Sequence, residues 1–238
     1  MPYLPDLIRS IREQDYPRIE HIVVDGGSTD GTLDVLKASE GLVWTSGRDG
    51  GMYDAINRGF ELAHGDVLAY QNSDDRYVVP SAVSRAVERL AEHADADAVY
   101  GRFRFIDADG RPIPGSESRP PPFEVARLRR YNCVPPHALF VRARAVKESG
   151  HWLDPGLHFA GDWDWVLGMA LAGRRLVQVP DLFAEFRLHG RSKTATVPWR
   201  RRAAEWRRIC RRHGVGFAWL VWHETFYVPL RRRLRLRA

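Results

Sequence analysis

The sequence predicts an α/β fold in which a mostly parallel sheet is flanked by helices. Short apolar runs alternate with segments of helical period, and glycine-rich or acidic turns separate them. The 238 residues are 44% hydrophobic and 28% charged. This composition provides enough apolar material for a core, and it argues against disorder, collagen or a coiled coil.

The first half of the chain alternates helix and strand. Residues 7–13 place leucine and isoleucine side chains on one helical face. Residues 20–25 form a short apolar run, which predicts a buried strand, and the turn at 26–32 supplies serine, threonine and aspartate as helix N-caps. Further strands are expected at 42–45, 66–71 and 98–105, and further helices at 33–39, 49–63 and 80–92.

The second half is less regular. Residues 115–122 are rich in proline and serine, which predicts a loop. Strands are expected at 138–141 and 176–179, and helices at 161–172, 205–212 and 217–230. We expect one domain at residues 1–198 and a basic, aromatic, helical tail at residues 199–238.

The start of the chain is unusual for such a sheet. An α/β sheet of this kind begins with an apolar strand before its first helix, and Met1 stands where that strand should end. We therefore expect the first strand to be missing from this sequence.

Positive charge is concentrated in the tail. Residues 199–238 contain twelve arginines and two glutamates, a charge of +10, so the first 198 residues carry −4 of the net +6. Tryptophan and tyrosine beside arginine favour an anionic membrane surface as partner. The alternatives are a solvated basic helix pair packed on the domain and, least favoured, nucleic acid.

Other features bear on location. The two cysteines fit a reducing compartment, residues after Met1 lack the apolar segment of a signal peptide, and no run of 18 apolar residues occurs. We expect a cytoplasmic protein, and the tail favours a peripheral position on the inner face of the plasma membrane.

Acidic residues follow two predicted strands. Asp25 ends one strand, and Asp74 and Asp75 follow another. Ligands of parallel sheets bind at the carboxyl ends of strands, where a carboxylate can accept hydrogen bonds from a base or ribose, or can hold a divalent cation. Each aspartate could instead serve a polar turn or cap a helix.

An ordered set of motifs resembles a known family. The motifs occupy residues 23–32, 49–59, 65–66, 72–75, 136–142, 161–165 and 186–192. Together they resemble the inverting family 2 glycosyltransferases of GT-A fold, a Rossmann-like nucleotide-diphospho-sugar fold, and especially bacterial enzymes of O-antigen and exopolysaccharide synthesis. The resemblance extends over about residues 4–192.

The resemblance implies a role for each matching residue on the donor side. Asp25 would bind the nucleotide base, and Asp74 would lie near the ribose. Asp75 would hold the metal and diphosphate, with His189 as a further metal ligand. The nucleotide-sugar side would be lined by Asp49, Asp54 and Asn57.

Asp162 would be the catalytic base, with Asp164 in reserve. The residue before Asp162 is glycine, where the family frequently has glutamate, and the Thr-x-Asn end of the first strand is absent. Trp163 and Trp165 could stack on a sugar or pack in the core. His137 could contact substrate or be a loop histidine with a satisfied side chain.

The implied activity is metal-dependent inverting transfer from a nucleotide-sugar to a saccharide, with a lipid-linked acceptor favoured. One carboxylate would take the acceptor proton, and Mg²⁺ or Mn²⁺ would neutralise the leaving diphosphate. A sugar nucleotidyltransferase is the competing enzyme class, and it would want a basic, glycine-rich phosphate loop. A non-catalytic sugar-nucleotide or membrane-surface binding protein is the third alternative.

Overall fold

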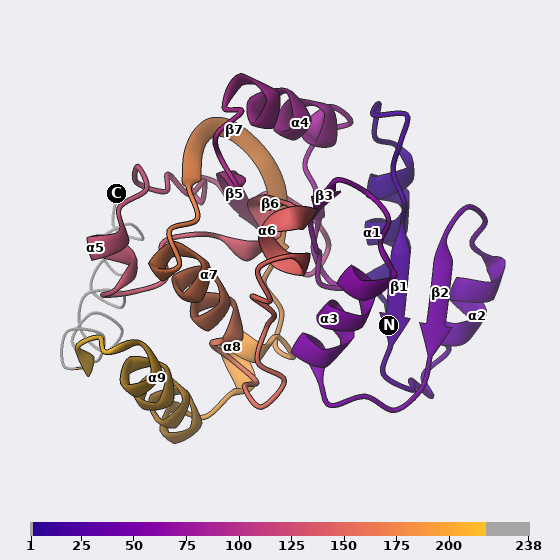
Figure 1. Ribbon diagram of the computed structural model, residues 1–238. Coiled ribbons are helices and arrows are strands. Elements are labelled where there is room, and N and C mark those ends of the chain that lie inside the picture. Colours follow the sequence, from indigo (N-terminus) through magenta and orange to yellow (C-terminus); the bar gives the residue numbers. More distant parts are fainter. Residues whose placement is uncertain (1, 218–238) are drawn as a thin grey trace.

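The structure, a computed structural model, describes residues 2–217 (Figure 1). Its helices are α1 (Leu4–Arg12), α2 (Thr32–Ala38), α3 (Met52–Leu62), α4 (Ala82–Glu92), α5 (Val125–Leu128), the 3-10 turn η1 (Pro136–Ala138), α6 (Ala143–Lys147), α7 (Gly161–Leu171), α8 (Lys193–Thr196) and α9 (Trp199–His213). Its strands are β1 (Ile22–Asp25), β2 (Val43–Ser46), β3 (Val67–Leu68), β4 (Arg76–Tyr77), β5 (Ala98–Ile106), β6 (Leu139–Arg142) and β7 (Leu176–Arg187).

The strands form two sheets of mixed direction. A five-stranded sheet has the order β3-β6-β5-β7-β4, and β1 pairs separately with β2. Only β5–β7 and β1–β2 are parallel among the described pairs, and the other three are antiparallel. The α/β class is as predicted, but the mostly parallel sheet is a correction. The irregular segment between β5 and β6 reverses the chain direction without a crossover helix, and strand–helix alternation cannot reveal that.

Helices cover both faces of the five-stranded sheet. Ala98 and Tyr100 pack in the largest core cluster with side chains of α3, α7 and α9, whereas Val99 packs in a second cluster with α4. Successive residues of a strand point to opposite faces, so α4 lies on the face opposite α3 and α7. The largest cluster includes the fully buried Trp163, and burial of a side chain of that size contributes about 2–3 kcal/mol.

The β1–β2 pair has its own small core with α1 and α2. Leu4, Leu7 and Ile8 of α1 meet Leu36 of α2 and the partly buried Val23. Among residues 2–217, β1 pairs only with β2, and β3 pairs only with β6. The expectation that a first strand is missing stays a prediction.

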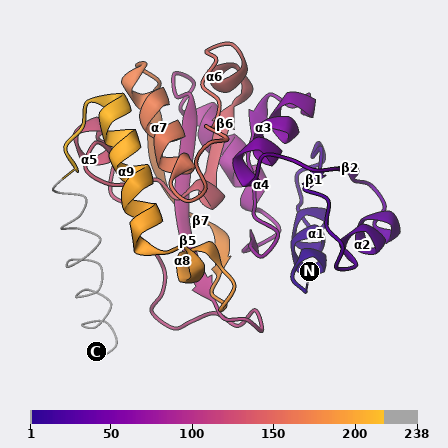
Figure 2. The same cartoon turned by 90° about the horizontal axis from the view of Figure 1, so that it is seen from below.

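The first helix of the predicted tail packs against the domain. In α9, Trp206, Ile209 and Cys210 are buried in the largest core cluster, beside α7 in both views (Figures 1 and 2). The helix begins at Trp199, six residues earlier than predicted. The helix predicted at 217–230 lies almost wholly outside the described residues, and the domain division at residue 198 remains a prediction.

Within residues 2–217, no helix combines the length and apolarity needed to cross a bilayer.

Candidate active site

Asp25 ends β1 with its carboxylate held by the following turn. Its Oδ2 accepts hydrogen bonds from the backbone N–H groups of Gly27 (3.0 Å) and Ser28 (2.9 Å) and from Ser46 Oγ (2.7 Å). Burial alone would raise the pKa of Asp25, but these hydrogen bonds outweigh it and lower the pKa below its usual value. The group is therefore a fixed anionic acceptor at the strand end.

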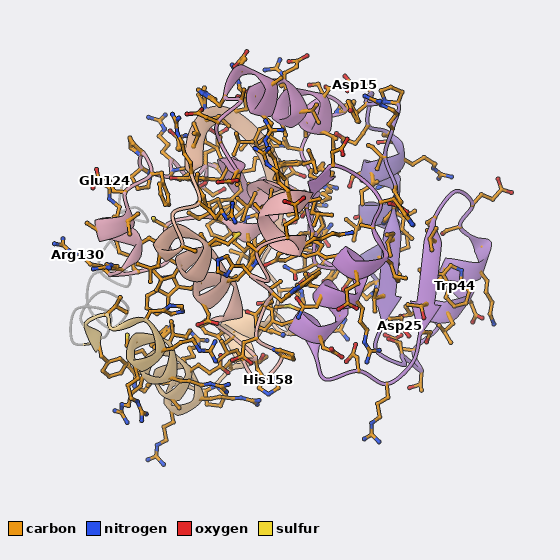
Figure 3. The ribbon with its side chains drawn as sticks, viewed as in Figure 1. Asp15, Asp25, Trp44, Glu124, Arg130 and His158 are labelled. Carbon is orange, nitrogen blue, oxygen red and sulfur yellow. The ribbon has the colours of Figure 1, made fainter. Side chains whose placement is uncertain are left out.

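The loop of Asp49 lies directly against the turn after Asp25. A Cβ on Gly26 would stand only 2.8 Å from Asp49 Oδ2, so a larger residue there would displace the Asp49 side chain. Asp49 Oδ1 accepts a hydrogen bond from the N–H of Gly51 (2.8 Å), which has a φ of 114°. A Cβ on Gly51 would in turn contact His158 at 3.7 Å. Figure 3 labels Asp25 at the end of β1 and His158 in the segment before α7.

Asp54 and Asn57, both in α3, hold backbone segments. Asp54 Oδ2 accepts from the N–H of Gly50 (2.9 Å) and pairs with Arg58 (3.0 Å). The Asn57 amide donates to the Leu153 carbonyl (2.8 Å) and accepts from the Leu153 N–H (3.1 Å). These contacts are structural, and the predicted place of both residues in the donor site stays a prediction.

Asp74 and His189 meet across the fold. Asp74 lies in the turn between β3 and β4, and His189 follows β7 by two residues. Asp74 Oδ2 and His189 Nε2 are 2.8 Å apart, and Tyr3 packs on the imidazole with ring centroids 4.9 Å apart. The structure thus brings together two residues that are 115 positions apart in the sequence.

Asp75 points away from this pair and into the protein. It is 1% exposed; Oδ1 accepts from the Arg187 N–H (2.9 Å), and Oδ2 accepts from Asn72 Nδ2 (2.9 Å). Burial and the charge of Asp74 raise the pKa of Asp75 to about 8, although the hydrogen bonds act in the opposite direction. Asp75 is therefore poorly placed to bind an ion from solvent, in contrast to Asp74.

Arg187 is a site residue that the sequence analysis missed. Its buried guanidinium donates to the Asp74 carbonyl (2.9 Å), pairs with Asp6 (3.1 Å) and stacks over Tyr3 at 4.5 Å. These contacts hold the Asp74 turn against the end of β7. The sequence held a signal, because Arg187 lies inside the motif at residues 186–192, but it was given no role there.

Asp162 is the second residue of α7 and is half-buried. Its Oδ2 accepts from Asn132 Nδ2 (2.9 Å), and its Oδ1 lies 3.4 Å from Tyr53 Oη. Burial raises the pKa of Asp162 to about 6, while the N–H groups of Trp163 and Asp162 and the side chains of Tyr53 and Asn132 act in the opposite direction. A carboxylate with this pKa can accept a proton near neutral pH.

The neighbours of Asp162 on α7 have structural roles. Asp164 is buried, pairs with Arg212 and lies 2.9 Å from His213 Nε2. The indole N–H of Trp163 donates to the Leu128 carbonyl, and that of Trp165 donates to the His151 carbonyl, both at 2.8 Å. Both tryptophans are buried, so core packing is the correct alternative for them.

His137 lies among aromatic rings. It is 5% exposed, its ring packs on Phe103 and Phe186 with centroids 4.4 and 5.1 Å apart, and its Nε2 has no hydrogen-bond partner among the described residues. Burial lowers the pKa of His137 to about 3, so the imidazole is neutral. This environment favours the structural alternative for His137, which lies in η1, although its Nε2 lacks the partner that this alternative includes.

Two further charged residues border the site. The Lys193 ammonium donates to the His158 carbonyl (3.2 Å), lies 5.7 Å above the Tyr53 ring and interacts electrostatically with Glu205, Asp162 and Asp74. Glu205 of α9 accepts from three consecutive backbone N–H groups just before α7, those of His158 (3.0 Å), Phe159 (2.8 Å) and Ala160 (3.0 Å). Neither residue carried a motif signal.

The Asp74–His189 pair has the chemistry of a partial cation site. A carboxylate oxygen and an imidazole nitrogen suit Mn²⁺, and substrate phosphates commonly complete such a shell. In the part of the chain that the structure describes, no group of three histidine, cysteine or acidic side chains gathers at one point. The residues present therefore fit a metal that is held jointly with a phosphate ligand.

Comparison with known proteins identifies the family. The model of the family described as "Glycosyl transferase family 2" matches residues 1–146 of the chain. An uncharacterized glycosyltransferase of Mycobacterium tuberculosis is 36% identical over 173 residues, which are 69% of this chain and 62% of the relative. A PGL/p-HBAD biosynthesis glycosyltransferase of Mycobacterium bovis is 38% identical over 103 residues, 41% of this chain and 40% of the relative. The chain thus spans less than two thirds of the curated relatives it matches.

Solved structures show the fold. Staphylococcus aureus TarS, residues 1–349, in complex with UDP-GlcNAc has a TM-score of 0.71 at 20% identity, covering 88% of this chain and 62% of TarS. The mannosyltransferase PcManGT of Pyrobaculum calidifontis, in complex with GDP-Man and Mn²⁺, has a TM-score of 0.62 at 21% identity, covering 88% and 61%. The chain has a GT-A fold and belongs to glycosyl transferase family 2.

Proposed function

We propose that the chain transfers a sugar, with inversion, from a nucleotide-sugar to a saccharide acceptor. The observation that carries this proposal is the half-buried carboxylate of Asp162, which is anchored at the start of α7 by Asn132 and lies 3.4 Å from Tyr53 Oη, a residue of the motif at 49–59. The family match supports sugar transfer, and the UDP-GlcNAc and GDP-Man complexes of two fold relatives support a nucleotide-sugar donor.

The donor nucleotide would lie along the turns after β1 and β2. Asp25, ionised and fixed, would accept hydrogen bonds from the base, and Asp49 would face the donor beside it. Asp54 and Asn57 would shape the same wall through the backbone segments that they hold.

A divalent cation would be held by Asp74 and His189 together with the donor diphosphate. When bound, Mg²⁺ or Mn²⁺ would neutralise the charge that develops on the leaving diphosphate. This assignment exchanges the predicted roles of the two neighbouring aspartates, because Asp75 is buried behind Asp74 with both carboxylate oxygens occupied. Arg187 would keep the Asp74 turn in place.

Asp162 would act as the base in a single displacement. The acceptor hydroxyl oxygen bonds to the anomeric carbon as the bond from that carbon to the diphosphate oxygen breaks, and Asp162 takes the hydroxyl proton. With a pKa of about 6, Asp162 is mostly ionised at pH 7 yet more basic than an exposed aspartate.

The acceptor would be lipid-linked, at the inner face of the plasma membrane, in synthesis of a cell-surface saccharide. The relatives named for PGL/p-HBAD biosynthesis support a glycolipid or polysaccharide product. The arginines of α9 support an anionic membrane surface as partner, because Arg200, Arg207 and Arg211 are exposed and no carboxylate within residues 2–217 pairs with them.

The Asp162→Asn variant tests the base assignment. The asparagine keeps the shape of the side chain but cannot take a proton, so turnover should fall by about 10²-fold or more while donor affinity stays within about twofold. Turnover is measured as release of nucleoside diphosphate, which also separates the proposal from a nucleotidyltransferase, whose product would be pyrophosphate. Unchanged turnover in the variant would remove Asp162 as the base.

A further inference from the structure

Asp162 has one close side-chain hydrogen-bond donor, and it comes from a loop that the motifs do not cover. Asn132, between α5 and η1, donates from Nδ2 to Asp162 Oδ2 at 2.9 Å. The nearest alternative, Tyr53 Oη, lies 3.4 Å from Asp162 Oδ1 and only 3.0 Å from the Phe159 carbonyl. Because the phenol has one proton and the carbonyl is closer, Asn132 is the stronger partner of the carboxylate.

The orientation of the Asn132 amide is fixed independently of Asp162. Its Oδ1 accepts a hydrogen bond from the backbone N–H of Val134 at 3.1 Å. A flipped amide would direct its NH₂ group at that N–H, so the carbonyl side is determined by the loop. The NH₂ group therefore points at Asp162 before any substrate binds.

Other charged and titratable groups around Asp162 come from several elements. Tyr53 of α3 and Tyr70, just after β3, interact electrostatically with Asp162, and both phenols have raised pKa values because of burial. Lys193 of α8 is the nearby cation, and Glu205 of α9 interacts with both Tyr53 and Lys193. Asp164, two residues along α7, is already engaged by Arg212 and His213.

We infer that Asn132 is the positioning residue of the catalytic base: its amide holds one oxygen of Asp162, favours the ionised carboxylate and leaves the other oxygen to face the acceptor hydroxyl. This inference rests on the proposed function of Asp162. A hydrogen bond donated to the charged form of a group favours that form, so Asn132 opposes the effect of burial on Asp162. The base stays ionised at the pH at which it works.

The Asn132→Asp variant tests this with a change of one group. The new side chain keeps an oxygen for the Val134 N–H but replaces the donor with a second carboxylate beside Asp162. We expect the acid limb of the pH profile of nucleoside diphosphate release to move up by about two units, and turnover to recover at high pH. Asn132→Leu removes the donor without adding charge and should move the limb in the same direction by about one unit.

Donor binding and a remote charge provide the controls. Donor affinity, measured by calorimetry with Mg²⁺, should stay within about twofold for both variants, because Asn132 faces the base and not the nucleotide. Ala91→Glu, which adds one negative charge on the exposed surface of α4, on the face of the sheet opposite α7, should leave the profile where the wild type has it.

The outcomes separate this inference from the proposed function. An unshifted acid limb, a uniform loss of turnover at every pH, or loss of donor affinity would each overturn the role of Asn132. If Asp162→Asn is inactive while the Asn132 variants keep the wild-type profile, the base assignment stands and only the inference fails. If Asp162→Asn keeps its turnover, Asp162 is not the base, and the inference about Asn132 is wrong as well.

Discussion

Two aspartates that are two residues apart on α7 have different roles. Asp162 meets Asn132 and Tyr53 on the side of the candidate site, whereas Asp164 turns toward α9 and pairs with Arg212 and His213. Residues two apart on a helix point about 200° away from each other, so both carboxylates cannot face one site. The sequence predicted this preference, but not the partners that hold Asp164.

The Asp164→Asn variant should therefore lose stability and keep activity. It removes the charge that joins α7 to Arg212 and His213, and because Arg212 is partly exposed we expect a loss of about 1–2 kcal/mol in the free energy of unfolding. Denaturant titration measures the loss. Turnover at a temperature where the variant is folded should match the wild type; a large drop there would assign Asp164 to catalysis.

His137→Phe should make the protein more resistant to acid. The folded-state pKa of His137 is about 3, below the usual 6.5, so the unfolded chain binds a proton that the folded chain excludes as pH falls below 6.5. At pH 5 this costs the wild type about 2 kcal/mol. Between pH 8 and pH 5 the wild type should therefore lose about that much more free energy of unfolding than the variant does. A difference in unfolding free energy that is independent of pH would contradict a buried neutral imidazole.

At the scale of elements, α9 is part of the candidate site. Glu205 accepts three backbone N–H groups in the segment directly before α7, and this segment leads into Asp162. One of these donors is the N–H of Ala160, the N-cap residue of α7, which a helix start leaves without a partner inside the helix. Helix α9, which the sequence assigned to a separate tail, thus holds the segment that leads into Asp162.

Glu205→Gln should loosen that segment. An amide offers one acceptor oxygen and a donor in place of two anionic oxygens, so it cannot accept all three N–H groups. Hydrogen exchange of the Phe159 and Ala160 amides should quicken by about tenfold or more, while exchange in β5 stays unchanged. Equal exchange in the variant and the wild type would show that other contacts hold the segment.

The outer face of α9 should bind anionic bilayers. Arg201, Arg208 and Arg212 pair with carboxylates of the fold, which leaves Arg200, Arg207 and Arg211 on the exposed side. Each arginine near an anionic surface contributes about 1 kcal/mol, so replacing the three with alanine should weaken binding to phosphatidylglycerol vesicles by about 10²-fold.

A matched control removes the same charge elsewhere. Arg12, Arg18 and Arg144 are exposed in other parts of the fold, and their triple alanine variant should sediment with vesicles nearly as the wild type does. Equal weakening in both variants would mean that net charge, and not the face of α9, governs the binding.

For the whole molecule, local sequence patterns predicted the bounds of helices better than the extent and direction of strands. Helices α3, α4 and α7 lie within about three residues of their predicted bounds, because amphipathic spacing and glycine turns are local signals. Strand β7 is an exception: only its first four residues were predicted, and its remaining part pairs with β4 and β5 through contacts distant in sequence. The prediction of a mostly parallel sheet was wrong for the same reason.

The candidate site follows the same division. The family resemblance assigned site roles to Asp25, Asp74, Asp162 and His189, which stay predictions, but it could not tell which of two adjacent aspartates is buried. That depends on Arg187, whose backbone N–H binds Asp75 from 112 residues away. Three further residues, Asn132, Lys193 and Glu205, reach the site only through tertiary contacts. No local sequence pattern could therefore predict their place there.

The central claim is that this GT-A domain binds a nucleotide-sugar through a metal, and calorimetry tests it most directly. UDP-, GDP- and dTDP-sugars are titrated into the protein with Mn²⁺, and again with EDTA. The account predicts micromolar binding of one nucleotide class that EDTA abolishes and that Asp74→Ala weakens about as much as EDTA does. Binding that is equal with Mn²⁺ and with EDTA, or no binding to any donor, would contradict it.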